Sequence, residues 1–229
     1  MSFLIENGIL LKYKGNDKTV VIPEGVTEIN SYVFTKNEEI EEVVLPDSIK
    51  TIGAGAFEKC KNLTKINFPN SLEVIDNNAF SWCENLQDVM IPRDLKELGM
   101  GAFSFCFNIT RINVPEKITK LKNNAFGGCK SLKNAVIPSN VEKVCDYAFS
   151  NCYDLEIVDL YEGIKEIGNF AFADCSFLTG IKIPKTVEKL GYGVFAGCTS
   201  LKYVKIQKDK EYDTKWTIDC PDKTRIIEY

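Results

Sequence analysis

Cysteine is the most reactive side chain in this protein of 229 residues, which contains nine cysteines and no histidine. Without histidine, Ser-His and Cys-His nucleophilic pairs and histidine-ligated zinc are excluded. Seven cysteines lie 23 residues apart, at Cys60, Cys83, Cys106, Cys129, Cys152, Cys175 and Cys198. At the ~4.8 Å spacing of stacked parallel strands their Cβ atoms would be too far apart for disulfides, so we expect free thiols packed as small apolar groups. Cys145 and Cys220 lie outside the series, and either could be a reactive thiol.

Paired carboxylates are the second candidate chemistry, because glycoside hydrolysis needs two of them ~5–9.5 Å apart. On the sheet face derived below, Asp88 and Asp159 are three repeats apart, or ~14 Å, and Glu42 and Asp88 are two repeats apart, or ~10 Å. Lys65 lies between Glu42 and Asp88. We therefore predict no catalytic residue, no metal, no cofactor and no enzymatic activity, while a polysaccharide-binding or polysaccharide-cleaving β-solenoid stays open as an alternative.

These residues are positioned by an internal repeat of 23 residues. Prolines hold this period at 23, 46, 69, 92, 115, 138 and 184, with Tyr161 in the one gap, and phenylalanines hold it at Phe34, Phe57, Phe80, Phe103, Phe126, Phe149, Phe172 and Phe195. A single 23-residue unit cannot bury its apolar side chains alone, so neighbouring units must stack. The sequence therefore predicts a solenoid with a continuous column of phenylalanines in its core.

Each unit contains signals for two kinds of local structure. Leu86–Ile91 ends in apolar-polar alternation and is followed by Pro92, which predicts a strand with one buried face. Ala79 and Cys83 are four residues apart with Phe80 beside them, which predicts a short helical segment. The expected fold class is an α/β-type repeat solenoid, with a parallel sheet on one side and short helical turns on the other.

Three segments follow from the repeat. Residues 1–22 contain Asn7-Gly8 between apolar arms and predict an N-terminal β-hairpin cap. Residues 23–206 hold eight repeats, and residues 207–229 lose the pattern and are expected to form a C-terminal β cap.

The repeat L-x-x-[VI]-x-[LIVF]-P followed by A-F-x-x-C resembles the BspA-like leucine-rich repeat family. Only the first unit departs from it, with Val33-Phe34 and Asn37 in the cysteine position. The resemblance implies a right-handed leucine-rich repeat solenoid with a parallel sheet on its concave side. It also implies a protein-binding role, often as a cell-surface adhesin that contacts host or matrix proteins.

The outward positions of the predicted strands are the candidate partner-binding residues. They are Glu42, Lys65, Asp88, Met90, Arg111, Asn134, Val136, Ile157, Asp159, Lys182, Tyr203 and Lys205. The alternating charges from Glu42 to Arg111 indicate either a polar binding patch or cross-strand pairing that keeps the sheet soluble. Val136, Ile157 and Tyr203, beside two lysines, favour a protein partner, although scattered exposed apolar side chains are the alternative.

Charge and hydrophobicity limit the partner and the location. A net charge of −4 argues against nucleic acid, and no apolar run approaches the ~20 residues that span a bilayer. The chain as written shows no signal peptide, so a cytoplasmic location is expected, or the cell surface if a leader has been removed. A structural spacer is the remaining alternative to a binding module. Neither the partner's identity nor the oligomeric state is predicted.

Overall fold

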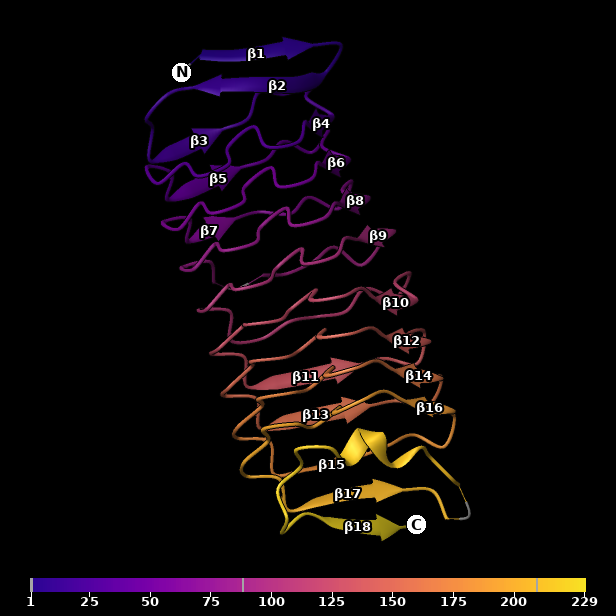
Figure 1. The fold of residues 1–229 in the computed structure, drawn as a ribbon. Coiled ribbons are helices and arrows are strands. Elements are labelled where there is room, and N and C mark those ends of the chain that lie inside the picture. The colour runs from indigo at the N-terminus through magenta and orange to yellow at the C-terminus, as the bar shows by residue number, and fades with distance from the viewer. Residues whose placement is uncertain (1, 88, 209) are drawn as a thin grey trace.

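The computed structural model describes residues 2–87, 89–208 and 210–229. The chain winds into an elongated stack of about nine turns, with the two termini at opposite ends (Figure 1). Each repeat contributes one turn of the stack, so the predicted solenoid is confirmed. Strands of neighbouring turns pair along two sides of the stack, which we call face I and face II.

Face I consists of strands at the alternating positions of the repeat, together with one strand in the C-terminal tail. They are β3 (Thr19–Val21), β5 (Glu42–Val44), β7 (Lys65–Ile66), β11 (Asn134–Ile137), β13 (Ile157–Leu160), β15 (Gly180–Lys182), β17 (Tyr203–Ile206) and β18 (Arg225–Glu228). All their pairings are parallel. In the described part of the chain they form the sheets β3-β5-β7, β11-β13 and β15-β17-β18. The described residues of the expected strand Leu86–Ile91 do not form one.

Face II is a second set of parallel strands that sequence reasoning missed. It contains β4 (Glu28–Ile29), β6 (Thr51–Ile52), β8 (Val74–Ile75), β9 (Glu97–Leu98), β10 (Lys120–Leu121), β12 (Lys143–Val144), β14 (Glu166–Ile167) and β16 (Lys189–Leu190). Each strand has two residues, the first directed outward and the second buried. Two residues are too few for alternation to be visible in a sequence, and these strands are stabilised by the turns on either side instead.

The helical segment predicted around A-F-x-x-C is wrong, because the chain forms successive tight turns there. In the second unit the N–H groups of Ala56, Glu58 and Cys60 donate to carbonyls three residues back, whereas those of Gly55, Phe57 and Lys59 donate to the next turn of the solenoid. Two positions per unit have left-handed φ in all eight units, such as 57° at Gly55 and 61° at Lys59. An α-helix cannot contain these angles. The one helix in the described residues is a 3₁₀ turn at Thr214–Thr217.

The core confirms the phenylalanine column and the free thiols. All eight repeat phenylalanines are buried, and adjacent rings stack at 4.9 Å between Phe34 and Phe57 and at 6.0 Å between Phe172 and Phe195. Each of the seven repeat cysteines is unpaired and buried. Its thiol donates to the carbonyl of the phenylalanine 26 residues earlier, as Cys60 does to Phe34 at 3.0 Å. The column therefore satisfies a polar atom on every turn of the core.

The two ends differ in structure. At the N-terminus, β1 (Ser2–Glu6) and β2 (Ile9–Lys14) form an antiparallel hairpin, and β2 pairs with β4. At the C-terminus the tail follows the path of another turn. Trp216 packs edge-on against Phe195 at 6.1 Å, the Cys220 thiol lies 3.9 Å from the Phe195 carbonyl, and β18 pairs with β17. Cys220 therefore extends the thiol column although its sequence position lies outside the period.

Candidate protein-binding face

The predicted binding residues that the structure describes lie on the outer surface of face I. Ten of the twelve are exposed, Glu42 is half-buried, and Asp88 lies outside the described residues. The strand register places Asn134 beside Ile157, Val136 beside Asp159, and Lys182 beside Lys205. These positions alternate with buried core residues such as Val158 and Val204. The alternation therefore identified the outward side chains correctly.

The N-terminal half of this surface contains a cross-strand ion pair. The Lys65 Nζ lies 2.8 Å from a Glu42 carboxylate oxygen, and this hydrogen bond raises the pKa of Lys65. The cross-strand interpretation of the charges therefore holds for this pair. Because the lysine side chain is largely exposed, the pair adds little stability.

Two asparagines on the same surface serve the backbone. Asn67 accepts a hydrogen bond from the Leu45 N–H at 2.7 Å and donates to the Leu45 carbonyl at 2.9 Å. Asn113 does the same for Ile91, at 2.9 and 2.7 Å. Their amides replace main-chain ladder bonds where the strands are short. These side chains are thus occupied, and the sequence offered no signal that separated them from free surface asparagines.

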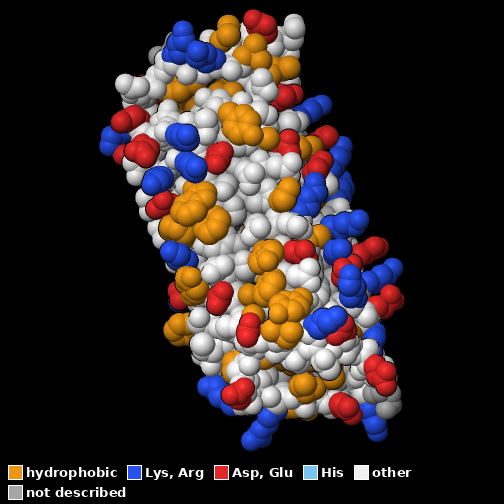
Figure 2. Space-filling view, in the orientation of Figure 1, with side chains coloured by type: hydrophobic (Ala, Val, Ile, Leu, Met, Phe, Trp, Pro, Cys, Tyr) orange, Lys and Arg blue, Asp and Glu red, His pale blue; other side chains and the backbone are white. Residues whose placement is uncertain are grey.

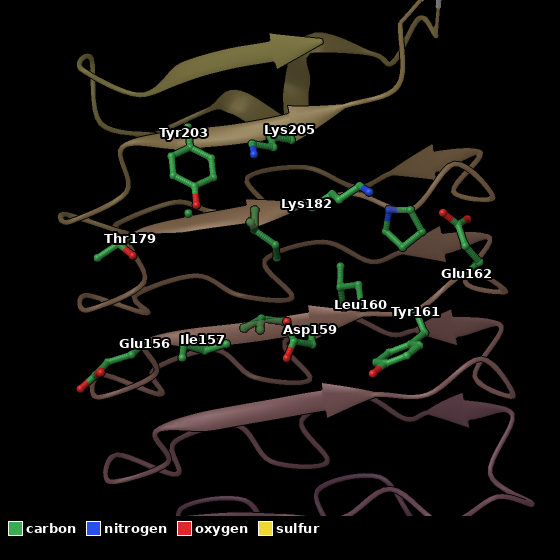
Figure 3. Close-up of a pocket in the computed structure, with 14 residues that line it drawn as sticks. Glu156, Ile157, Asp159, Leu160, Tyr161, Glu162, Thr179, Lys182, Tyr203 and Lys205 are labelled. Carbon is green, nitrogen blue, oxygen red and sulfur yellow. The ribbon is translucent and has the colours of Figure 1, made fainter. Parts of the chain in front are cut away.

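The C-terminal half of face I contains a hollow of about 610 Å³ where β13 and β15 are not paired with each other. Five of the predicted residues come together around it: Ile157, Asp159, Lys182, Tyr203 and Lys205. Glu42, Lys65, Met90 and Arg111 lie on turns nearer the N-terminus and do not line it. Figure 3 shows the lining side chains on successive turns of the solenoid. Figure 2 shows hydrophobic side chains gathered in this part of the surface among charged groups.

Tyr203 is held in place by a glycine that sequence reasoning did not select. A Cβ atom added at Gly180 would lie 2.2 Å from the Tyr203 ring, so the ring rests on the backbone of β15. In Figure 3 the tyrosine extends from β17 toward β15. Because any larger residue at position 180 would displace the ring, this contact fixes the orientation of an exposed aromatic group.

Two tyrosines were missed because they lie outside the alternating pattern: Tyr161, which lines the hollow, and Tyr229, which contacts the lining residue Lys182. Tyr161 occupies the position of the repeat that is proline at the seven equivalent places. Its side chain is 56% exposed, and its N–H donates to the Ile137 carbonyl at 3.0 Å. Tyr229 donates its hydroxyl to the Ile183 carbonyl at 2.8 Å and lies under Lys182, whose Nζ is 4.3 Å from the ring centre. The Lys205 Nζ lies 5.4 Å from the Tyr203 ring. Aromatic rings therefore position both lysines.

Among the described residues there is no group of three His, Cys, Asp or Glu side chains that could hold a metal ion. Nor do the described residues include a helix long and apolar enough to cross a membrane. The surface offers rigid aromatic rings, aliphatic side chains and charged groups of both signs.

Comparison with known proteins places this architecture in a family. The family model of the BspA type leucine rich repeat region, in six copies, matches residues 10–133 and 121–218. The chain belongs to the BspA-type leucine-rich repeat family. Proteins with such repeats generally take part in protein interactions or lie at the cell surface, and no enzyme family is indicated. No curated protein sequence matches the chain.

Solved structures of bacterial leucine-rich repeat proteins resemble this BspA-type chain. A leucine-rich repeat protein from Bacteroides ovatus is 26% identical with a TM-score of 0.71, over 99% of this chain and 65% of that protein. The T. pallidum leucine-rich repeat protein is 27% identical with a TM-score of 0.68, over 84% of this chain and 82% of its own. The pneumococcal vaccine antigen PcpA, at 18% identity and a TM-score of 0.53 over 92% of this chain and 74% of that one, shows the fold alone. The chain thus spans 65% of the length of the Bacteroides ovatus protein.

Proposed function

We propose that this BspA-type chain is a non-enzymatic protein-binding module whose partner docks on the C-terminal half of face I. We call the docking surface the C-terminal patch; it comprises Val136, Ile157, Asp159, Tyr161, Lys182, Tyr203 and Lys205. The observation that supports it is the hollow between β13 and β15, which combines exposed aromatic and aliphatic side chains with charged groups at its edge. Such a centre and rim are typical of protein interfaces.

The apolar centre of the patch is suited to supply binding energy. Ile157 and Tyr161 are 52% and 56% exposed, so a partner can still bury much of each side chain. Tyr203 is already oriented by Gly180, so it loses little conformational freedom on binding. Tyrosine is also over-represented among the residues that dominate interface energies.

The charges of the patch restrict what the partner can present. Lys182 and Lys205 lie on the β15 and β17 side, whereas Glu156 and Asp159 lie on the β13 side. Glu162, also beside the hollow, is occupied by the N–H groups of Lys185 and Thr186. A complementary partner therefore offers an apolar or aromatic group flanked by an acidic side chain toward the lysines and a basic one toward β13.

Binding should be tested with matched variants of the full chain. The immobilised chain is used to isolate a partner from host-cell or matrix extracts, and binding of that partner is then measured for Ile157→Asp, Tyr203→Ala and the control Val44→Asp. Val44 is also an exposed strand residue on face I, at 37%, but lies in the N-terminal half. We expect both patch variants to abolish binding and the control to retain it. Retention by the patch variants, or equal loss in the control, would overturn the assignment.

The finer form of the proposal is an adhesin-like protein that contacts host or matrix proteins at the cell surface. Membership of the BspA-type family supports it. Antibody staining of intact and permeabilised cells tests the location, since a cytoplasmic protein is stained only after permeabilisation. If the chain were a structural spacer, it would bind no partner whose binding is lost in the patch variants. If it bound polysaccharide, it would be retained on glycans rather than on protein.

A further inference from the structure

Face II is interrupted once among its described strands, between β9 and β10. In the next turn, the N–H groups of Glu142 and Lys143 donate to the Thr119 carbonyl at 2.8 and 3.3 Å, and Cys145 donates to the Leu121 carbonyl at 2.8 Å. The equivalent donors at the interruption are the N–H groups of Thr119, Lys120 and Lys122. In the described part of the chain they form no hydrogen bond. Three backbone donors therefore point at a gap.

The opposite wall of the gap carries unpaired acceptors. The carbonyls of Lys96 and Leu98 are equivalent to those of Thr119 and Leu121, and no described N–H group donates to them. The β8-β9 ladder on the other side of this turn is intact, with the Gly99 N–H donating to Ile75 at 2.7 Å. The gap thus has donors on one wall and acceptors on the other.

Lysines surround this gap. A hollow of about 260 Å³ lies here, lined by Lys96, Glu97, Leu98, Lys117, Ile118, Thr119, Lys120 and Lys122. Three of the four lysines reach carboxylates at 2.6–2.7 Å: Lys96 pairs with Glu73, Lys117 with Asp94, and Lys122 with Glu97. Lys120 has no ion pair among the described residues. The three existing pairs are exposed and weak, so an incoming anion can compete for these lysines.

We propose that this gap binds a phosphate group that retains a proton, as hydrogen phosphate or a phosphate monoester. The phosphate oxygens would accept hydrogen bonds from the N–H groups of Thr119, Lys120 and Lys122 and from the lysine side chains, as in other backbone anion sites. The phosphate hydroxyl would donate to the carbonyl of Lys96 or Leu98. Sulfate carries no such proton, so it can satisfy only the donor wall.

This site is independent of the proposed function. It lies on face II, whereas the C-terminal patch lies on face I, and the two share no lining residue. A phosphate bound here would also bridge two turns that the backbone leaves unconnected on this face. Loss of one site therefore leaves the other intact, and the two proposals can fail separately.

The test is an NMR titration of the ¹⁵N-labelled full chain with inorganic phosphate near pH 6, about the second pKa of a phosphate monoester. Sulfate at matched ionic strength and O-phosphoserine are titrated in parallel, the latter to separate free phosphate from a monoester source. We expect saturable shifts of the Thr119, Lys120 and Lys122 amides with phosphate or O-phosphoserine, and weaker ones with sulfate. Lys120→Gln should weaken binding about threefold to fivefold, as expected for the loss of one partly screened charge contact.

Lys165→Gln is the matched control, because Lys165 is exposed, directly precedes the face II strand β14, and has no ion pair in the described structure. It should leave phosphate affinity unchanged. The proposal is overturned if the three amides show no saturable shift, which would mean that water alone fills the gap. It is equally overturned if Lys165→Gln weakens binding as much as Lys120→Gln, and equal binding of sulfate would refute the requirement for a proton.

Discussion

Truncating one ring of the phenylalanine column tests the physical basis of the stack. Phe103 is fully buried and lies between Phe80 and Phe126, with ring centres 5.2 and 5.8 Å away and planes within 4° of parallel. Phe68 approaches it edge-on at 6.3 Å. Phe103→Ala removes an entire ring from a position where rings on both adjacent turns are fixed by their own neighbours, so the space cannot close.

The expected loss in the free energy of unfolding is about 3–5 kcal/mol, from the transfer of the ring to water and the cavity left behind. The missing contacts with the rings above and below place the value in the upper part of that range. Phe177→Ala is the control, because that ring is 56% exposed and its removal should cost no more than about 0.5 kcal/mol.

Urea denaturation followed by circular dichroism and tryptophan fluorescence gives both values. Trp82 stacks on Phe105 near the middle of the solenoid and Trp216 packs on Phe195 at its C-terminal end, so single-tryptophan variants report the two regions separately. Coincident transitions justify a two-state fit. A cost below about 1 kcal/mol for Phe103→Ala would show that the column does not support the fold as its geometry indicates.

Two further changes probe polar groups of the core and of face I. Asn113→Ala leaves the N–H and carbonyl of Ile91 without partners, so it should lower the free energy of unfolding by about 1–3 kcal/mol and speed hydrogen exchange of the Ile91 amide. The control is Asn134→Ala, because the Asn134 side chain forms no hydrogen bond in the described structure, and it should change neither quantity. Equal effects of the two variants would refute the bridging role of Asn113. Burial raises the pKa of the Cys60 thiol to about 12, so the unfolded chain releases this proton first as the pH rises. Its contribution is fully present below about pH 8.5 and falls by about 1.4 kcal/mol per pH unit above that value, until the folded thiol also ionises. Unfolding of Cys60→Ser measured between pH 8 and about 10 should therefore show a shallower decline than wild type, and identical slopes would contradict a buried neutral thiol.

The 23-residue period predicted the features that depend on neighbouring turns being alike. The solenoid, the phenylalanine column and the buried thiols follow from one residue type recurring at one spacing, and the outward positions of face I follow from the alternation within each unit. The helix prediction failed because Ala79 and Cys83 have helical spacing although the backbone between them does not keep helical angles. Gly55, Asn78, Gly101 and Asn124 recur at one left-handed position and carried the missing signal. The signal was hard to recognise because Tyr147 and Phe170, which are not typical of left-handed φ, occupy the same position in two other units.

The hollow could not be predicted because it depends on how far adjacent turns separate. No residue pattern distinguishes the paired strands β11 and β13 from the unpaired strands β13 and β15, since both pairs are 23 residues apart. The contact of Tyr203 with Gly180 likewise joins two turns, and is visible only once the register is known. The sequence does show one irregularity near the hollow, because Tyr161 replaces the proline of the repeat there.

Departures from the repeat are where a solenoid of equivalent turns can acquire specific recognition. A position that keeps its residue type on every turn, such as the core phenylalanine, stabilises the stack and cannot distinguish one site from another. On face I, Tyr161 and Gly180 line the hollow where β13 and β15 are not paired with each other. On face II, four lysines line the hollow where β9 and β10 are not paired with each other. In both places adjacent turns are not joined by ladder hydrogen bonds on that face, and this is why the two proposed sites and the variants that test them lie at these interruptions.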